Sequence, residues 1–308
     1  MQKKKILTIV LLIICCFVFC ACGTNLRADE DRETVSNELD LGVEKEENTE
    51  IDVDKEETTD KKEEAPNDDV EEPNDVENSN DDVENSNDEK IDGEEQVDKV
   101  TYVRATADVN VRKGASTTYA IVGVMDEGDM LLYKGETDGW YETLYKGERA
   151  FVSSTYSEKY ELDKGGDDIE RVIELGCEKL GTPYVYGAIR LHDGNGNMYG
   201  TFNEEEFDCS SFMQYIFYYG AGIYLDVTTR TQVYQGTLIE KQQSMRGDLI
   251  FFTNADRYDN EGIERVGHVA LYLGDGYVLH TASDHAVIER LSDLRKSYYL
   301  CTKRIICS

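Results

Sequence analysis

The feature that most limits what this chain can fold into is a long acidic stretch, residues 23–100, with no periodic apolar pattern. Residues 29–99 hold 32 Asp and Glu but only 7 Lys and Arg, a net charge of −25 out of −32 for the whole chain. Such a composition cannot bury enough apolar surface to offset the entropy lost on ordering. We therefore predict a disordered acidic linker over 22–100, and a folded part confined to the residues after it.

The charge outside this linker is close to balanced, so the overall acidity says little about binding partners. The heptapeptide DVENSND occurs twice in tandem, at 75–81 and 82–88, which is typical of a spacer. A flexible spacer of this length reaches roughly 45–50 Å. The folded part has no basic patch with interleaved aromatic residues, so we expect no nucleic-acid partner.

The N-terminus, MQKKKILTIVLLIICCFVFCACG, has the layout of an export signal. Three lysines precede an apolar run, 6–21, that is short for a membrane span and typical of a secretory signal peptide. FCAC resembles a bacterial lipobox, with Ala21 before the cut and Cys22 after it. The resemblance implies a signal peptide over 1–21, a lipid on Cys22, and anchoring at the outer face of the bacterial membrane. An ordinary signal peptide or an uncleaved anchor remains an alternative.

Four cysteines remain in the folded part: Cys177, Cys209, Cys301 and Cys307. Export permits disulfides. The last two would lie about 20 Å apart on one extended strand, too far to bridge. We expect buried thiols, with a disulfide from Cys177 to one of the last two as an alternative.

Residues 102–156 alternate polar and apolar side chains in short runs separated by glycine turns, which predicts a small all-β barrel. VNVRKGAS, GDMLLY, DGWYET and FVSSTY resemble motifs of the bacterial SH3-like (SH3b) family. The resemblance implies a wall-associated accessory module over 101–157, and in related enzymes such a module can form one wall of the substrate groove. Trp140, the only Trp, is either a binding residue or a core residue.

Two helices are predicted after the barrel. DDIERVIELGCEKLG has one apolar stripe, and Asp167 with Glu170 resembles a capping box. A second stripe begins at Cys209 in EEFDCSSFMQYIF, and Gly220 and Gly222 are expected to end it.

Cys209 stands in the first turn of this second helix, after a favoured N-cap residue, Asp208. Free backbone amides and the helix dipole favour an anion there, so we predict a lowered thiol pKa. Spacing alone leaves a nucleophile and a core cysteine equally open. A nucleophile needs a base.

Two of the four histidines lie in GHVALYLGDGYVLH, which reads as a β-hairpin turning at 274–276. With a three-residue loop, His268 and His280 face the same side, within reach for linked imidazole rings. A two-residue loop would break this parity. The pair then supplies a general base oriented by a second ring. The alternative is two unrelated strand histidines.

Six segments together resemble motifs of the NlpC/P60 cysteine peptidase family: GTPYVYGAIR, FDCSSF, RTQVYQ, RGDLIFF, GHVALYLGDG and YVLHTAS. The resemblance covers about 140 residues. Ser211 and Ala188 stand where the family has Gly. It implies an α+β, papain-like domain over 167–308, with helices packed on an antiparallel sheet.

The resemblance also implies roles. Cys209 is the nucleophile, His268 the base and His280 the orienting residue. The substrate-binding set beside the thiol is Tyr184, Asp208 and Ser210. The substrate is the γ-D-glutamyl–diamino acid bond of peptidoglycan stem peptides, cleaved by a monomer without cofactor or metal. An N-acetylmuramoyl-L-alanine amidase and a catalytically inactive wall-binding lipoprotein are the alternatives.

The segment LHDGNGNMYGTFNEEEF is longer than the loop usual in that family. Asp193 begins D-x-N-x-N, and Glu204 stands at the twelfth position, as in a calcium loop. Met198, however, occupies the place where such a loop needs Gly. We expect a surface hairpin here and no metal site.

Overall fold

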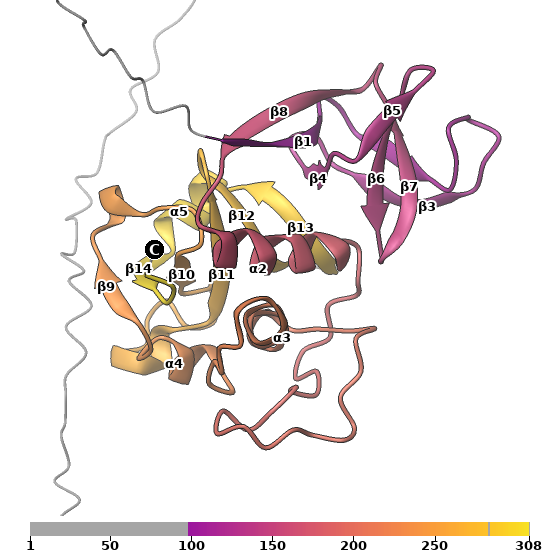
Figure 1. Cartoon of the computed structure of the whole chain (residues 1–308). Helices are drawn as coiled ribbons and strands as arrows, with labels where there is room; N and C mark the ends of the chain where they lie inside the picture. The colour runs from indigo at the N-terminus through magenta and orange to yellow at the C-terminus, as the bar shows by residue number, and fades with distance from the viewer. Residues whose placement is uncertain (1–97, 283, 308) are drawn as a thin grey trace, which may run out of the picture. The chain divides into compact units, whose positions relative to one another are not determined.

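The computed structural model describes residues 98–282 and 284–307. The predicted signal peptide, the lipidated Cys22 and almost all of the predicted linker lie outside these residues. The described part begins with an all-β module and continues into a mixed helix-and-sheet domain (Figure 1).

The first module consists of two antiparallel sheets, with strand orders β4-β1-β8 and β3-β2-β7-β6-β5. The strands are β1 (Lys99–Ala105), β2 (Val109–Arg112), β3 (Ile121–Met125), β4 (Met130–Leu132), β5 (Gly135–Thr137), β6 (Trp140–Tyr145), β7 (Glu148–Ser153) and β8 (Ser157–Asp163). The strands thus extend beyond the predicted bounds at both ends. Trp140 begins β6 and is half-buried, outside the apolar core.

The second domain has a six-stranded antiparallel sheet of order β13-β12-β11-β10-β14-β9. Its strands are β9 (Thr237–Ile239), β10 (Leu249–Phe252), β11 (His268–Gly274), β12 (Tyr277–Ala282), β13 (His285–Arg290) and β14 (Tyr299–Arg304). Its helices are α2 (Asp167–Glu178), α3 (Cys209–Ala221), α4 (Thr229–Gln232) and α5 (Asp293–Ser297). This confirms the predicted α+β architecture of helices on an antiparallel sheet.

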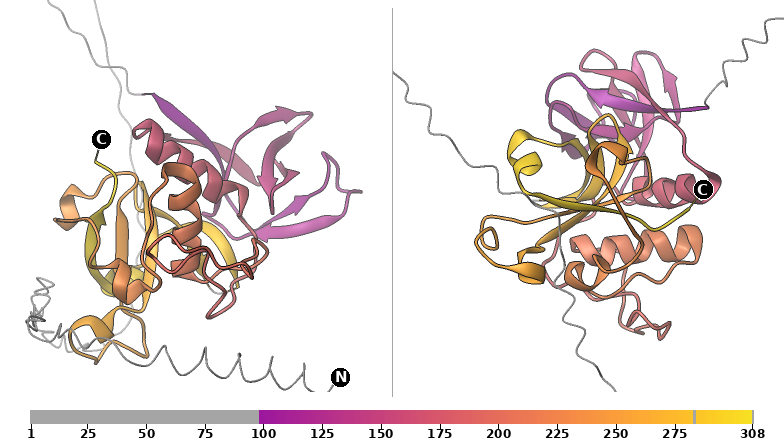
Figure 2. Two further views of the ribbon diagram at one scale, coloured as in Figure 1. Left: turned by 60° about the horizontal axis from the view of Figure 1, so that its bottom comes forward. Right: turned by 90° about the vertical axis from the view of Figure 1, so that its left-hand side faces the viewer.

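The two faces of this sheet have different partners. On one face, Val269, Leu271 and Leu279 join the main core together with the buried sides of α2 and α3. Figure 2 shows both helices on that side of the sheet. On the other face, Ala270 and Val278 belong to a smaller apolar cluster. Because side chains alternate along a strand, neighbouring residues of β11 therefore serve different faces.

Helix α2 forms where its apolar stripe predicts, but its predicted capping box is wrong. Gly166 is the N-cap and makes no side-chain cap hydrogen bond. Glu170 instead accepts a hydrogen bond from the Gly165 amide at 2.7 Å and pairs with Arg246. The carboxylate that sequence spacing assigns to the helix end is thus used to fasten neighbouring elements.

Helix α3 ends at Gly222, as predicted, in a left-handed C-cap with φ of 68°. Gly220 does not end the helix. It lies inside the last turn, where an added Cβ would stand 2.7 Å from the Cα of Val172 in α2. The glycine is therefore required by the close approach of the two helices.

His268 and His280 lie on the same face of the β11–β12 hairpin, as predicted, but the turn between the strands differs from the predicted one. Leu271 pairs with Leu279. The turn has two residues rather than the predicted three, because Gly274 pairs with Tyr277. The register shifts between Tyr272 and Gly274, so one extra residue is accommodated as a bulge. The shorter loop and the bulge cancel, and His268 and His280 stay on the same face.

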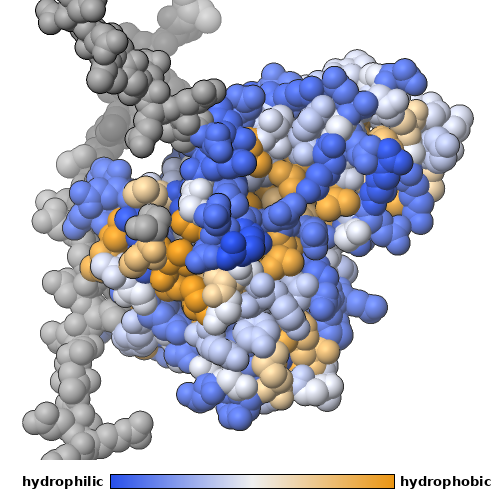
Figure 3. All heavy atoms as spheres, in the orientation of Figure 1, coloured by the Kyte–Doolittle hydropathy of each residue, from blue (hydrophilic) through white to orange (hydrophobic). Residues whose placement is uncertain are grey.

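On the face shown in Figure 3, apolar residues occur in separate patches among polar ones. Within residues 98–282 and 284–307, no helix has both the length and the apolar character needed to cross a bilayer.

Arg246 joins the barrel to the second domain, both of which belong to one structural unit. Its guanidinium donates to both carboxylate oxygens of Glu170 in α2, at 2.6 and 2.9 Å. It also donates to the hydroxyl of Tyr102 in β1 at 2.8 Å and to the carbonyl of Leu273 in β11 at 3.0 Å. One buried cation thereby holds three elements together.

We predict that Arg246→Met destabilises the folded fragment by about 3 kcal/mol, because it leaves a largely buried carboxylate without its partner. Urea denaturation of residues 98–308 measures the change. Lys296→Ala, which breaks an exposed pair with Asp293, is the matched control and should leave stability nearly unchanged. If the Arg246 variant loses less than about 1 kcal/mol of unfolding free energy, Arg246 does not hold these elements together.

Candidate active site

Cys209 is the first residue of α3, and its backbone position is fixed by a reciprocal cap. Asp208 Oδ1 accepts a hydrogen bond from the Ser211 amide at 2.8 Å, and the Ser211 hydroxyl oxygen accepts one from the Asp208 amide at 2.9 Å. Ser211, which replaces a family glycine, thus completes a capping box. The cap holds the thiol at the helix end, against the start of β11.

The backbone amides of Val269 and Ser210 act as donors toward the Cys209 sulfur and lower the pKa of its thiol. These donors favour a thiolate, as the sequence predicts, but they do not decide the outcome. Burial, reinforced by the nearby Asp208 carboxylate, raises the pKa of the Cys209 thiol to about 12. The predicted lowering of this pKa is therefore wrong for the substrate-free protein, because only 8% of the residue is exposed and desolvation outweighs the helix end.

His268 and His280 form the hydrogen-bonded pair that the hairpin argument predicts. His268 Nε2 lies 2.7 Å from His280 Nδ1. His268 is half-buried and His280 is fully buried. Burial, together with the charges of His280 and Arg295, holds the pKa of His268 well below its ordinary value. At neutral pH the His268 ring is therefore uncharged and able to accept a proton.

Two charged residues that sequence reasoning missed stand behind this pair. Glu289 Oε1 lies 3.0 Å from His280 Nε2, and Arg295 Nη2 lies 3.5 Å from the same carboxylate oxygen. Glu289 faces Val278 across the β12–β13 ladder, two positions from His280 on the same face. Its place in the alternating segment HAVIER, directly after the second histidine strand, is the signal that could have found it.

Of the three predicted substrate-binding residues, Tyr184 lines a groove, whereas Asp208 and Ser210 are buried. Tyr184 lines a groove of about 310 Å³ together with His268, Asn254, Arg295 and Tyr298. Burial, followed by the charges of Cys209 and Asp208, raises the pKa of the Tyr184 phenol.

Asp208 and Ser210 are buried behind this groove and already have partners within the protein. Asp208 Oδ2 pairs with Arg190 at 2.8 Å, and Asp208 Oδ1 accepts a hydrogen bond from the Ser210 hydroxyl at 3.1 Å. Both carboxylate oxygens are thus engaged. Arg190, whose guanidinium pairs with the Asp208 carboxylate, was not identified from the sequence.

The other two histidines stand apart from the pair. His192 is buried beside Tyr218 and Tyr224, and His285 lies at the barrel-facing edge of the sheet. The preferred interpretation of the cysteines as free thiols holds for Cys177, Cys209, Cys301 and Cys307, but Cys307 is exposed rather than buried.

The long insertion forms a tight turn in which Asp193 serves its own loop. Its carboxylate accepts hydrogen bonds from the amides of Asn195 and Asn197, at 2.8 and 3.1 Å. His192 and Met198 form an isolated antiparallel bridge across the turn. Within the described residues, no three His, Cys, Asp or Glu side chains gather in a way that could hold a metal ion.

Comparison with known proteins identifies both folded parts. Residues 181–305 match the profile of the NlpC/P60 family, and residues 107–158 match that of the bacterial SH3 domain. A gamma-D-glutamyl-L-lysine dipeptidyl-peptidase of Bacillus subtilis is 30% identical over 68% of this chain and 66% of its own length. A gamma-DL-glutamyl hydrolase of the same organism is 25% identical over 66% of this chain, and a peptidoglycan DL-endopeptidase of Bacillus licheniformis is 31% identical over 50%. This chain spans 52% of that hydrolase and 32% of that endopeptidase.

We predict that alkylation of Cys209 by iodoacetamide is slow at pH 6 and still accelerates above pH 9. The reason is that burial raises the pKa of this thiol, so the reactive thiolate grows only as the pH approaches about 12. Peptide mass spectrometry reads the modification, with the exposed Cys307 of the same molecule as reference. A rate that reaches its plateau by pH 7 would show instead that the thiolate is already present.

Proposed function

With an NlpC/P60 domain over residues 181–305 and a bacterial SH3 domain over residues 107–158 as the premise, we propose that this chain is a cell-wall peptidoglycan hydrolase. It cleaves the γ-D-glutamyl–diamino acid bond of stem peptides as a cysteine peptidase. Cys209 is the nucleophile, His268 the general base and His280 the ring that orients it. The observation that carries the proposal is the 2.7 Å contact between the two imidazoles, because His268 stands next to Val269, whose amide acts on the Cys209 sulfur.

The first half of the reaction forms an acyl-enzyme. As the Cys209 sulfur attacks the amide carbonyl carbon, its proton passes to Nδ1 of His268, the nitrogen not engaged with His280. The carbonyl electrons move to oxygen, to which the Tyr184 hydroxyl donates a hydrogen bond in this proposal. Collapse of this intermediate breaks the C–N bond, and His268 gives the proton to the departing amine of the diamino acid.

The second half releases the acid. A water molecule attacks the thioester carbonyl while His268 accepts a proton from it. The C–S bond then breaks, and His268 returns the proton to the Cys209 sulfur. Because burial favours the uncharged thiol and the uncharged imidazole before substrate binds, the pair develops opposite charges only during attack.

The names of the relatives support the substrate class. A peptidoglycan DL-endopeptidase acts on peptidoglycan, and the other two relatives are named for glutamyl bonds that are hydrolysed. The groove that Tyr184 and His268 share also contains Arg295, a cation suited to the carboxylates that accompany such a bond. We propose that the SH3 module serves as a wall-associated accessory part of the enzyme.

We predict that residues 98–308 convert purified muropeptides into fragments cut after D-glutamate, and that Cys209→Ala abolishes this. Removal of the attacking sulfur leaves no nucleophile. Mass spectrometry of the digest locates the cut, and Cys307→Ser, which alters an exposed thiol, is the matched control that should retain activity. Identical products from wild type and the Cys209 variant would disprove peptidase action, and cleavage at the muramoyl–alanine bond would assign an amidase instead.

We further propose that the mature chain is anchored by a lipid on Cys22 at the outer face of the cell membrane. The support is the FCAC sequence at the end of the apolar run, followed by Gly23. A diacylglyceryl group with an additional acyl chain holds a protein stably at a bilayer, whereas one chain does so only marginally. The acidic spacer would then let the folded domains act at a distance from the bilayer.

We predict that the full-length protein, expressed in a bacterial host fed labelled palmitate, carries label and sediments with membranes. Cys22→Ser should lose the label and be released, because the acceptor thiol is gone. Cys16→Ser, within the apolar run, is the matched control and should behave as wild type. Label that persists in the Cys22 variant would refute the assignment.

A further inference from the structure

We propose that Glu289 is a positioning residue that fixes which nitrogens of His280 and His268 carry protons. This rests on the proposed function, since it concerns the same pair of rings. The three side chains form a chain of hydrogen bonds: Glu289 Oε1 to His280 Nε2 at 3.0 Å, then His280 Nδ1 to His268 Nε2 at 2.7 Å. The chain begins at an ionised carboxylate and ends at His268, the ring that the proposed reaction uses as its base.

The carboxylate sets the proton positions because it can only accept hydrogen bonds when ionised. Glu289 therefore requires a proton on Nε2 of His280, and in a neutral ring this leaves Nδ1 as an acceptor. His280 Nδ1 in turn requires a proton on Nε2 of His268. Nδ1 of His268 is then left with a free lone pair. That is the nitrogen that takes the Cys209 proton in the proposed reaction.

Glu289 is held in its ionised form by its surroundings. Although burial opposes it, the hydrogen bond with His280 and the charges of His280 and Arg295 keep the pKa of Glu289 below its ordinary value. Without this partner the fully buried His280 would have no acceptor for its second nitrogen among the contacts it makes. Burial lowers the pKa of His280, and the Glu289 carboxylate offsets part of that lowering.

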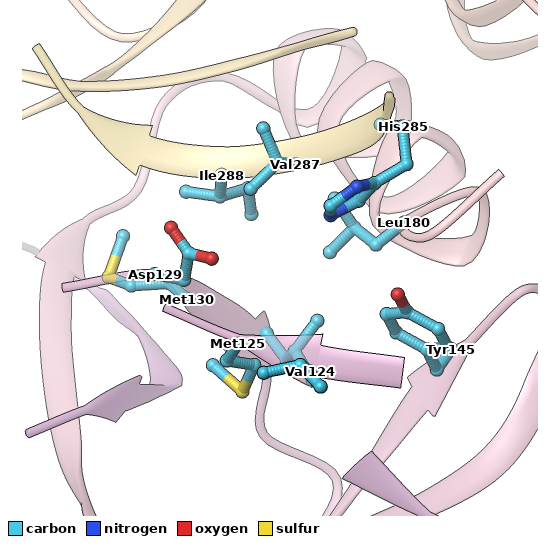
Figure 4. Close-up of a pocket in the computed structure, with 11 residues that line it drawn as sticks. Val124, Met125, Asp129, Met130, Tyr145, Leu180, His285, Val287 and Ile288 are labelled. Carbon is cyan, nitrogen blue, oxygen red and sulfur yellow. The ribbon is translucent and has the colours of Figure 1, made fainter. Parts of the chain in front are cut away.

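The accessory module contributes one more charge to this end of the chain. Figure 4 shows Asp129 of the β3–β4 turn in a small pocket, opposite Val287 and Ile288 of the strand that carries Glu289. Burial, together with Asp126 and Glu289, raises the pKa of Asp129 to about 7. The groups that face Glu289 are therefore His280 from β12, Arg295 from α5 and Asp129 from the barrel. Glu289→Gln and Glu289→Ala remove the same charge from beside Asp129, so its titration shifts in the same direction in both variants.

The decisive experiment reads the tautomers directly. Residues 98–308 carrying Cys209→Ala, with ¹⁵N-labelled histidine, are compared at pH 7 with and without Glu289→Gln by long-range ¹H–¹⁵N correlation. The protein has only 4 histidines, so the rings can be assigned. We expect both His268 and His280 as single Nε2–H tautomers with Glu289, and a loss of that single state with Gln, whose amide donates as readily as it accepts. This readout needs no catalysis, so it stands even if the substrate assignment fails.

Kinetics of the active fragment provide a second readout. Glu289→Gln should lower kcat by about 10- to 100-fold with KM nearly unchanged, the size usual for a residue that orients a catalytic group from behind. Its kcat/KM profile should also shift its acid limb to lower pH, because loss of the anion destabilises the imidazolium. Glu289→Ala should act in the same direction. Asp293→Asn, a 99% exposed carboxylate on the nearby α5, is the control for simple charge loss and should change neither kcat nor the tautomers.

Unchanged tautomers in Glu289→Gln would overturn the proposal, whatever the activity. A fall in kcat with the same tautomers and the same acid limb would also overturn it, since a purely structural role predicts that result. Altered tautomers with a lowered kcat would support it. Circular dichroism and thermal melting verify that each variant is folded, and the partly exposed position of Glu289 favours this.

Discussion

The chemistry proposed for this protein depends on one hydrogen bond, between Nε2 of His268 and Nδ1 of His280. Two imidazoles can meet this way only if both side chains stand on the same face of a β-hairpin at neighbouring positions. A shift of one residue in the register would turn one ring to the opposite face. The bulge next to Gly274 compensates for the two-residue turn and keeps the two rings on one face.

Cys209, the proposed nucleophile, belongs to a helix on the opposite face of the sheet from the two histidines. Helix α3 packs with the main core, whereas His268 and His280 share the face of the smaller cluster around Ala270 and Val278. The first turn of α3 meets the N-terminal end of β11, where the Val269 amide approaches the Cys209 sulfur. The thiol and the base are thus presented by two elements that belong to different packing layers. Clamps such as Arg246, which ties α2 to β1 and β11, keep those layers in register.

The sequence was sufficient to predict what depends on local patterns. Period and capping placed Cys209 at a helix start. Alternation placed both histidines on one face, but its premise of a three-residue loop is wrong, and an unpredicted bulge preserves the result. The sequence failed where the answer depends on distant segments. The thiol pKa rises because of burial by tertiary packing, which a helix-end argument cannot include. Arg190 reaches Asp208 through a loop whose path is not encoded in any short motif. Glu289 was within reach of the strand argument, since it alternates with the apolar residues of β13, but only the β12–β13 register places it beside His280.

The neutral state of Cys209 and His268 follows from their burial. Desolvation raises the pKa of Cys209 and lowers that of His268, so each group separately favours its uncharged form. An ion pair would then form only when the developing oxyanion and the attacking sulfur are stabilised together by fixed donors. In such a site the direction of proton transfer is decided before substrate arrives, by which ring nitrogen has a lone pair. That decision belongs to the hydrogen-bond chain rather than to the thiol. The role proposed for Glu289 follows, because a carboxylate two rings away from Cys209 then decides which nitrogen of His268 takes the proton.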